Sequence, residues 1–405
     1  MSSLSEEVEL SLDISADISN SNFAEKMSSF EFFKLSAQGV VAPNPRDGHA
    51  ATVLGLRALL VFGGVTETPL NKSDDDDDDD DDDGIVRHTE QDNADDDDDI
   101  DEDENPLREL NDLWQFDFSS ATWSQLAMSG DVPTPRTGSV MFRGASADVV
   151  FVFGGFSQQS GWSSELFRAD LQTKRWTRVG DDDDLGDVPT CRDKIASATG
   201  ADGRVWLYGG FGPLVAEAGD DGFGDGQTFK WFDDLFVFDP ARQRFTRVPC
   251  TNAEPRCAAA AAVVGNELLV FGGSFSRDPA KRSDELRALT LPAAGAESAQ
   301  PSEWRVIAAA NAPSGRSFVS AANVGGSFVV FGGKGRQDQP LGDGGVFCNG
   351  AWAPLAPLTE RPSARQYAQL VVREDQTHAL LYGGSGAALG NEVRLGDLWI
   401  LRAKP

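Results

Sequence analysis

The sequence predicts an all-β protein built from six similar units, and three observations carry this prediction. Six short runs rich in β-branched or aromatic residues each end in a pair of glycines. An arginine precedes the first glycine of every pair by 16 to 18 residues. A further apolar run and then a bulky aromatic residue follow the pairs in most units. Self-similarity at a regular period indicates a repeat architecture.

The paired glycines close apolar runs of about five residues, the size of a buried strand. Glycine suits a strand end at which the backbone turns sharply and neighbouring segments approach closely. The pairs are Gly63 and Gly64, Gly154 and Gly155, Gly209 and Gly210, Gly272 and Gly273, Gly332 and Gly333, and Gly383 and Gly384.

The repeated arginines keep step with the glycine pairs. Six regularly spaced arginines could form an anion-binding ring, but their recurrence favours a structural role in every unit, with bonds to carbonyls or to neighbouring acids. These arginines are Arg46, Arg136, Arg192, Arg256, Arg316 and Arg365.

A third and a fourth strand complete each unit. The third strand starts near Asn111, Ser163, Asp233 and Gly396, and its fifth copy, from Asp343, is degenerate. The fourth strand carries the recurring aromatic residue, which is Trp123, Trp176, Phe245, Trp304 or Trp352.

This order of arginine, glycine pair, Asp-Leu-aromatic strand and tryptophan resembles the kelch repeat over about residues 30 to 405. The resemblance implies a six-bladed kelch-type β-propeller, in which four-stranded blades hide their edges by radial repetition. A single blade cannot bury both of its faces, so the ring has to close.

The sequence also indicates how the ring closes. The sixth unit stops at Leu401 after its third strand and lacks an aromatic fourth strand. The segment Phe32–Leu35 precedes Arg46 much as Trp123 precedes Arg136. We therefore expect an N-terminal strand near residues 30 to 36 to close the last blade.

Two segments are expected to lie outside the ring, which spans 29–405. Residues 1–28 read as a disordered, acidic and Ser-rich tail. A disordered acidic insertion occupies about 66–109 in the first blade, and between Lys72 and Glu104 it holds 21 acidic and two basic residues, a local charge of −19. Three interpretations of this insertion stay open: a tolerated surface expansion, a lure for basic partners by electrostatic steering, or loose buffering of divalent ions.

Composition narrows the class of protein. The 65 acidic and 35 basic residues give a net charge of −30, which disfavours direct binding of nucleic acid. No apolar run reaches about 18 residues, so we expect no membrane insertion. Four cysteines without CxxC spacing indicate a reduced protein, which we place in the cytoplasm with the nucleus as the alternative. We expect the chain to be monomeric by itself.

The sequence offers little material for catalysis. Three histidines and three tyrosines are scattered along the chain, and no GxSxG, HExxH or P-loop pattern occurs. Glu374, Asp375 and His378 are the residue types of the iron site in plant specifier proteins, which are also kelch rings, but their spacing is wrong. We therefore expect a non-catalytic protein without cofactor or metal.

The resemblance to kelch domains implies that partners bind through residues directly after the repeat arginine and after the glycine pair. Asp47 and Asp193 are expected to place negative charge on this rim and so to favour partners with basic segments. Phe156, Phe211 and Phe275 are expected to be apolar anchors. The first set is Asp47, Thr137, Asp193, Lys194, Ser317, Gln366 and Tyr367, and the second is Phe156, Phe211, Ser274, Phe275, Lys334, Arg336 and Ser385.

These observations predict a protein-interaction scaffold or substrate-recognition module that binds other proteins on the loop face of the ring. Two alternatives remain. The acidic insertion could make the chain a chaperone-like escort of basic proteins, or the ring could be a metal-dependent enzyme of the specifier or oxidase type.

Overall fold

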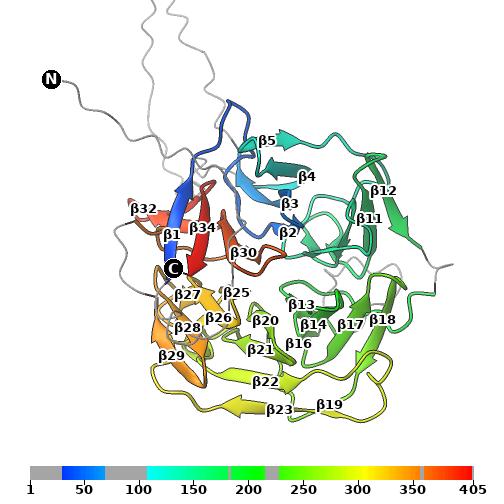
Figure 1. Ribbon diagram of the computed structural model, residues 1–405, viewed down its shortest axis with the longest axis vertical. Coiled ribbons are helices and arrows are strands. Elements are labelled where there is room, and N and C mark those ends of the chain that lie inside the picture. The colour runs from blue at the N-terminus through cyan, green and yellow to red at the C-terminus, as the bar shows by residue number, and fades with distance from the viewer. Residues whose placement is uncertain (1–29, 69–106, 181–183, 215–227, 356–359, 404–405) are drawn as a thin grey trace, which may run out of the picture.

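A computed structural model describes residues 30–68, 107–180, 184–214, 228–355 and 360–403. These residues form short β-strands and, within the described ranges, one 3₁₀ turn at Pro279–Lys281. Figure 1 shows the sheets arranged as a ring around a common centre. The predicted six-bladed propeller is therefore confirmed, whereas the 1–28 tail and most of the acidic insertion lie outside the described residues.

Each blade is a four-stranded antiparallel sheet, numbered here in the order of the repeat arginines. From the centre of the ring outward, blade 1 consists of β2 (Ala50–Leu54), β3 (Ala58–Glu67), β4 (Leu107–Asp117) and β5 (Thr122–Gln125); blade 2 of β7 (Val140–Arg143), β8 (Val149–Phe153), β11 (Leu166–Asp170) and β12 (Arg175–Val179); blade 3 of β13 (Ala196–Thr199), β14 (Val205–Tyr208), β17 (Leu235–Asp239) and β18 (Arg244–Val248); blade 4 of β20 (Ala260–Val264), β21 (Glu267–Phe271), β22 (Leu286–Thr290) and β23 (Ser302–Ile307); blade 5 of β25 (Ser320–Val324), β26 (Ser327–Phe331), β28 (Gly344–Cys348) and β29 (Ala351–Pro354); and blade 6 of β30 (Gln369–Val372), β31 (His378–Tyr382), β34 (Leu398–Ala403) and β1 (Phe30–Leu35).

The hydrophobic core lies between neighbouring blades. Leu60 and Phe62 of blade 1, for example, share one buried cluster with Val150 and Trp176 of blade 2. The rings of Phe62 and Trp176 meet edge to face with their centroids 5.5 Å apart. Each blade therefore depends on both neighbours for the burial of its faces, which explains why the strands are apolar on both sides.

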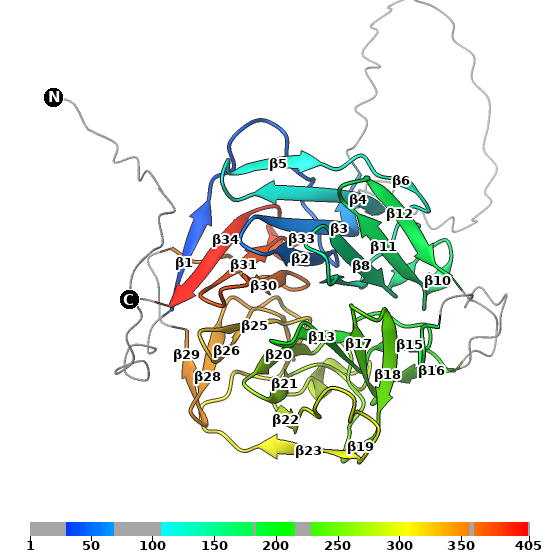
Figure 2. The same ribbon diagram turned by 45° about the vertical axis from the view of Figure 1, so that its right-hand side comes forward.

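The N-terminal strand closes the ring as the sequence predicts. β1 pairs with β34 in antiparallel register from Phe30 opposite Ala403 to Leu35 opposite Leu398, and the two lie side by side in Figures 1 and 2. Phe32 is buried and pairs with Leu401, as Trp123 pairs with Phe116 in blade 1. Phe32 thus takes the place of the repeat aromatic that the C-terminal unit lacks.

Linkers between blades cover several outer strand edges. The residues that follow one blade run parallel to the outermost strand of the next, as β6 (Ser129–Gly130) does along β12 and β19 (Cys250–Thr251) along β23. Isolated bridges from Gln38 to Thr122 and from Gly186 to Phe245 repeat this arrangement. Covering an edge in this way protects it against pairing with another chain.

Short two-stranded ribbons extend from the blades beyond the glycine pairs. In blade 1, β3 and β4 continue past the pair to Glu67 opposite Leu107, so the acidic insertion is narrower than the expected 66–109 at both ends. The other ribbons are β9 (Phe156–Ser157) with β10 (Gly161–Trp162), β15 (Phe211–Pro213) with β16 (Phe229–Trp231), β24 (Arg316–Ser317) with β27 (Lys334–Gly335), and β32 (Ser385–Ala388) with β33 (Asn391–Arg394).

Removal of β1 should destabilise the whole ring. A chain that starts at Ala37 loses the strand that covers blade 6, and we expect its melting temperature to fall by roughly 10 °C or more. A chain that starts at Phe30 keeps β1 and serves as the control, with an expected change close to zero. Thermal unfolding followed by circular dichroism measures both, and equal melting temperatures for the two chains would contradict the closure.

Candidate functional site

One face of the ring collects all the residues that the sequence marks as candidates. Each first strand begins there after its arginine, each second strand ends there in its glycine pair, and the ribbons project from it. We call this the arginine face. The opposite face, where a turn joins the first strand of a blade to the second, is the hairpin face.

The repeat arginines lie under this face and are at most 2% exposed. In every blade the arginine Nη1 donates to the carbonyl oxygen of the first glycine of its pair, at 2.9–3.2 Å. Each guanidinium also forms an ion pair of 2.5–3.2 Å with an acid that lies in the third strand or directly before it. Those acids are Asp112, Glu165, Asp234, Glu285, Asp343 and Asp397.

The same arginines connect neighbouring blades through their backbones. The second glycine of each pair donates its N–H to the carbonyl oxygen of the next blade's arginine at 2.8–2.9 Å, and Gly384 closes the circle on Arg46. Gly384 has φ +95°, and a Cβ there would lie 2.6 Å from the carbonyl oxygen of Gln366. Glycine is therefore required at this junction for both its conformation and its size.

The two positions from which the predicted contact residues come, directly after the arginine and directly after the glycine pair, meet in pairs. In every blade the residue after the arginine bridges in antiparallel fashion to the residue after the glycine pair. The pairs are Asp47 with Val65, Thr137 with Phe156, Asp193 with Phe211, Cys257 with Ser274, Ser317 with Lys334, and Gln366 with Ser385.

The expectation that Asp47 and Asp193 present negative charge on the rim is wrong. Asp47 is 7% exposed and accepts a hydrogen bond from Nε of Arg394 at 3.1 Å. Asp193 is 1% exposed and pairs with Lys194 and with the indole N–H of Trp162. Burial raises the pKa of both carboxyls, an effect that the paired cations oppose but do not cancel. Both acids therefore lie beneath the loops of the arginine face and bind neighbouring side chains there.

The other candidates differ in depth. Ser317, Gln366 and Ser385 are buried beneath the surface. Phe275 and Arg336 are exposed, and the guanidinium of Arg336 lies 3.1 Å from Asp284. The half-buried candidates are Thr137, Phe156, Lys194, Phe211, Lys334 and Tyr367. Exposed and half-buried side chains are those able to contact a partner directly.

A ring of backbone hydrogen bonds surrounds the mouth of the central channel. The second residue after each arginine has a left-handed φ of 52° to 67°. At five blade junctions, the N–H of this residue donates a hydrogen bond to the carbonyl oxygen of the equivalent residue in the preceding blade. Phe318 and Tyr367 stack there with ring centroids 3.8 Å apart. The residues of this ring are Gly48, Gly138, Lys194, Ala258, Phe318 and Tyr367.

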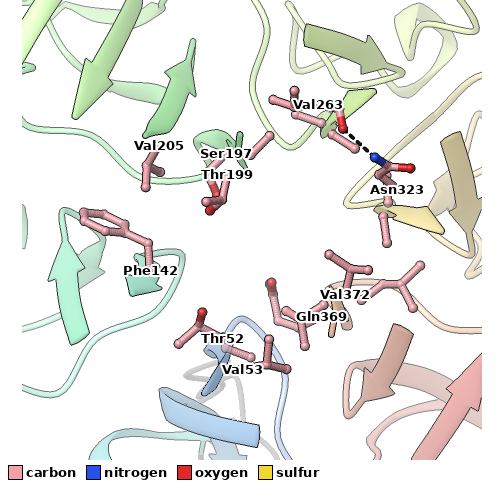
Figure 3. Close-up of a pocket in the computed structure, with 18 of the residues that line it drawn as sticks. Thr52, Val53, Phe142, Ser197, Thr199, Val205, Val263, Asn323, Gln369 and Val372 are labelled. Atoms are coloured by element: carbon pink, nitrogen blue, oxygen red, sulfur yellow. Dashed lines mark hydrogen bonds between the residues drawn. The ribbon is translucent and has the colours of Figure 1, made fainter. Parts of the chain in front are cut away.

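The channel itself holds two cavities. One of about 120 Å³ lies below the mouth, and a larger one of about 380 Å³ opens toward the hairpin face. Thr52, Ser197 and Gln369 line the larger cavity among small apolar residues, and in Figure 3 Asn323 is hydrogen-bonded to the carbonyl oxygen of Val263 at 2.8 Å. Most of the channel lining is therefore small and uncharged, with Arg143, Arg373 and Glu374 as charged residues of the larger cavity, and none of the ribbons lines it.

Phe156 and Phe211 belong to an aromatic cluster on blades 2 and 3, of which the sequence reasoning missed Trp162, Phe229 and Trp231. The rings of Trp162 and Phe229 meet at 5.1 Å, and Trp162 also contacts Phe156 at 4.6 Å and Phe211 at 5.8 Å. All of the side chains are half-buried. The one sequence signal of the three missed residues is that they are aromatic and lie outside the repeat pattern. The aromatic cluster consists of Phe156, Trp162, Phe211, Phe229 and Trp231.

This geometry is that of a kelch-type propeller, with repeat arginines and glycine pairs in all six blades. The family model described as the KLHDC2/KLHL20/DRC7 Kelch-repeats domain matches residues 100–256 and 218–404. The chain belongs to this kelch-repeat family, and the resemblance stated from the sequence is confirmed.

Several known proteins are similar to the chain. Kelch domain-containing protein 1 of Mus musculus is 26% identical over 297 residues, which cover 68% of each chain. Kelch domain-containing protein 2 of Bos taurus is 27% identical over 299 residues, or 67% of each. An N-(sulfonatooxy)prop-2-enimidothioate sulfolyase of Thlaspi arvense is 25% identical and covers 62% of this chain and 76% of its own. The solved structure titled "Structure of YjhT" shares the fold, with a TM-score of 0.59, 15% identity and coverage of 88% of this chain and 95% of its own.

Neither a metal cluster nor a membrane span is found in the described ranges. No three His, Cys, Asp or Glu side chains there are grouped closely enough to hold a metal ion. No helix in the same ranges is long and apolar enough to cross a bilayer.

The ion pair of Asp397 with Arg365 should make stability depend on pH. Burial alone would raise the pKa of Asp397, but the hydrogen bonds and charge of Arg365 outweigh it and hold the pKa below 3.8. The carboxylate therefore stabilises the fold above its ordinary pKa, and this contribution is lost as the pH falls through the lowered value. We expect Asp397→Asn to cost about 2–4 kcal/mol at pH 7 and progressively less below about pH 4.

Urea denaturation of the wild type and the variant across a pH series measures this difference. Asp233→Asn is the control, because this carboxylate is 46% exposed and 3.7 Å from Lys230. A constant difference between wild type and Asp397→Asn down to pH 3 would contradict the assignment.

Proposed function

We propose that this chain is a protein-interaction module that holds its partners on the arginine face. The observation that carries the proposal is a division between constant and variable positions. The arginine and the glycine pair are identical in all six blades and buried, whereas the residue directly after the pair differs in character from blade to blade. Variable side chains on a constant frame are what a recognition surface needs. The residues after the pairs are Val65, Phe156, Phe211, Ser274, Lys334 and Ser385, and all of them except the buried Ser385 are half-buried.

A non-catalytic role fits the chemistry of the titratable groups. Glu374 lies 3.3 Å from Arg143 and Asp375 lies 3.3 Å from Arg373, so both carboxylates already have basic partners. His378 is engaged with Thr377. These three residues are the types that a specifier-type iron site would use. The similarity to the sulfolyase is the observation that favours this enzyme as an alternative function.

The partners proposed here are proteins with basic segments. The insertion between Lys72 and Glu104 has a charge of −19, and such a field raises the encounter rate with basic partners. The same charge supports an escort of basic proteins as the second candidate function. All four cysteines are free thiols, in keeping with the reducing compartment proposed from the sequence.

A photo-crosslinking residue placed on either face of the full chain tests the proposal. Phe275 is the second residue after the glycine pair of blade 4 and is 41% exposed, and Leu56 lies in a turn of the hairpin face and is 56% exposed. We expect cells that carry the residue at position 275 to give covalent adducts with a discrete set of proteins, identified by mass spectrometry. Adducts of equal yield at position 56, or adducts at position 56 alone, would refute binding on the arginine face.

A further inference from the structure

We propose that the larger cavity of the channel binds a small, neutral, polyhydroxylated molecule of the class of a monosaccharide or a cyclic polyol. This cavity opens toward the hairpin face, at the opposite end of the channel from the arginine face. The inference therefore goes beyond the protein-binding function proposed above and does not depend on it. All residues that line the cavity belong to the described part of the chain.

Small side chains keep this space open. Alanine is depleted in β-strands, yet the innermost strands carry it repeatedly along the cavity wall. Blade 4 places alanine at residues 260–262, and Ala51, Ala198 and Ala322 add to the wall from blades 1, 3 and 5. Larger aliphatic side chains at these positions would fill the channel. The resulting volume of about 380 Å³ lies within the range of small-molecule sites.

Three polar side chains face the cavity without a bond to the protein. Figure 3 shows Thr52 of blade 1, Ser197 of blade 3 and Gln369 of blade 6 pointing into the space. They are half-buried, and their side chains form no hydrogen bond with the described residues. Ser320 of another innermost strand, by contrast, donates its hydroxyl to the carbonyl oxygen of Ala368 at 2.6 Å. The three free groups thus hold hydrogen-bonding capacity that the packing of the ring does not use.

Hydroxyl and amide groups match the hydroxyl groups of a ligand. A hydroxyl has one donor and two acceptor lone pairs, and a primary amide has two donors and a carbonyl oxygen. Each hydroxyl of a polyol can therefore donate to one wall of the cavity and accept from another. The alanine and valine side chains between the polar groups suit the C–H groups of a saturated ring. A compact carbon frame with several hydroxyls satisfies both kinds of wall.

Paired charges at the rim favour a neutral ligand. Arg143 of blade 2 lies 3.3 Å from Glu374 of blade 6, and Arg373 lies 3.3 Å from Asp375. The first pair passes over the turn of blade 1, where a Cβ at Gly55 would lie 2.9 Å from Oε2 of Glu374. Glu374 is 58% exposed, and its Oε1 accepts no hydrogen bond from the described residues. The rim thus has no net charge from these pairs but offers a carboxylate oxygen to the hydroxyls of a ligand.

Saturation-transfer NMR and isothermal titration calorimetry on the full chain test the proposal with D-glucose, D-mannose and myo-inositol. We expect saturable binding of at least one of these molecules. Cyclohexanol is the matched probe, because it keeps a six-membered ring but has a single hydroxyl. We expect it to bind at least about tenfold more weakly, since the polar groups of the wall would be left without partners.

Two substitutions locate the binding site in the channel. The double variant Thr52→Val/Ser197→Ala removes two hydroxyls with little change in volume, and we expect it to weaken binding about tenfold through the loss of two hydrogen bonds. Thr251→Val is the control, because Thr251 lies in β19 at the outside of blade 4 and lines neither cavity. Circular dichroism melting curves show whether each variant is folded. If the double variant unfolds, Gln369→Leu alone takes its place with the same expected direction.

The outcomes separate this site from the proposed function. Absence of saturable binding by all three molecules overturns the proposal and leaves a channel that holds water alone. Equal affinity of the wild type and a folded channel variant also overturns it, as does equal binding of cyclohexanol. Crosslinks at position 275 report on the arginine face, and we expect the channel variants to leave them unchanged. Their absence in the wild type would refute the proposed function without bearing on the channel.

Discussion

The ring depends on the buried repeat arginine. Removing a guanidinium from water is costly unless all of its charge is compensated. Here each one meets a glycine carbonyl and a carboxylate of its own blade, while its backbone joins the preceding blade. These two roles of the arginine also require a pair of glycines. Gly383 offers its carbonyl to Arg365, and Gly384 offers its N–H to Arg46, and both need a left-handed backbone.

Because the buried arginines and glycine pairs join the blades beneath the arginine face, the sequences of the ribbons above them can differ. A substitution in a ribbon leaves the bonds of the repeat arginine and glycine pair in place, although some ribbon side chains, such as Arg394, form further contacts with the next blade. Blades 2 and 3 use this freedom for aromatic residues, blade 5 for Lys334 and Arg336, and blade 1 for the acidic insertion. The chemistry of the arginine face is therefore uneven around the ring, although the backbone beneath it repeats.

The sequence was sufficient to locate the repeating elements, but it was insufficient to show how deeply individual side chains are buried. Spacing alone located the six arginines, the glycine pairs and Phe32 as the substitute for a missing aromatic. It misjudged Asp47, because the arginine that neutralises it, Arg394, lies in another blade and nearly the full chain away. It overlooked Trp162 and Trp231 because the ribbons follow no repeat, so that only the folded chain brings their rings together.

The pairing of β1 with β34 means that the ring can close only after most of the propeller has been synthesised. Glu31 and Arg402 are hydrogen-bonded although they are 371 residues apart. At a ribosomal speed of roughly 5–20 residues per second, the first strand waits on the order of 20 to 70 seconds for its partner. During this interval its apolar residues have no sheet to join. Closure of the ring is therefore a late event in folding, because it joins segments from opposite ends of the propeller sequence.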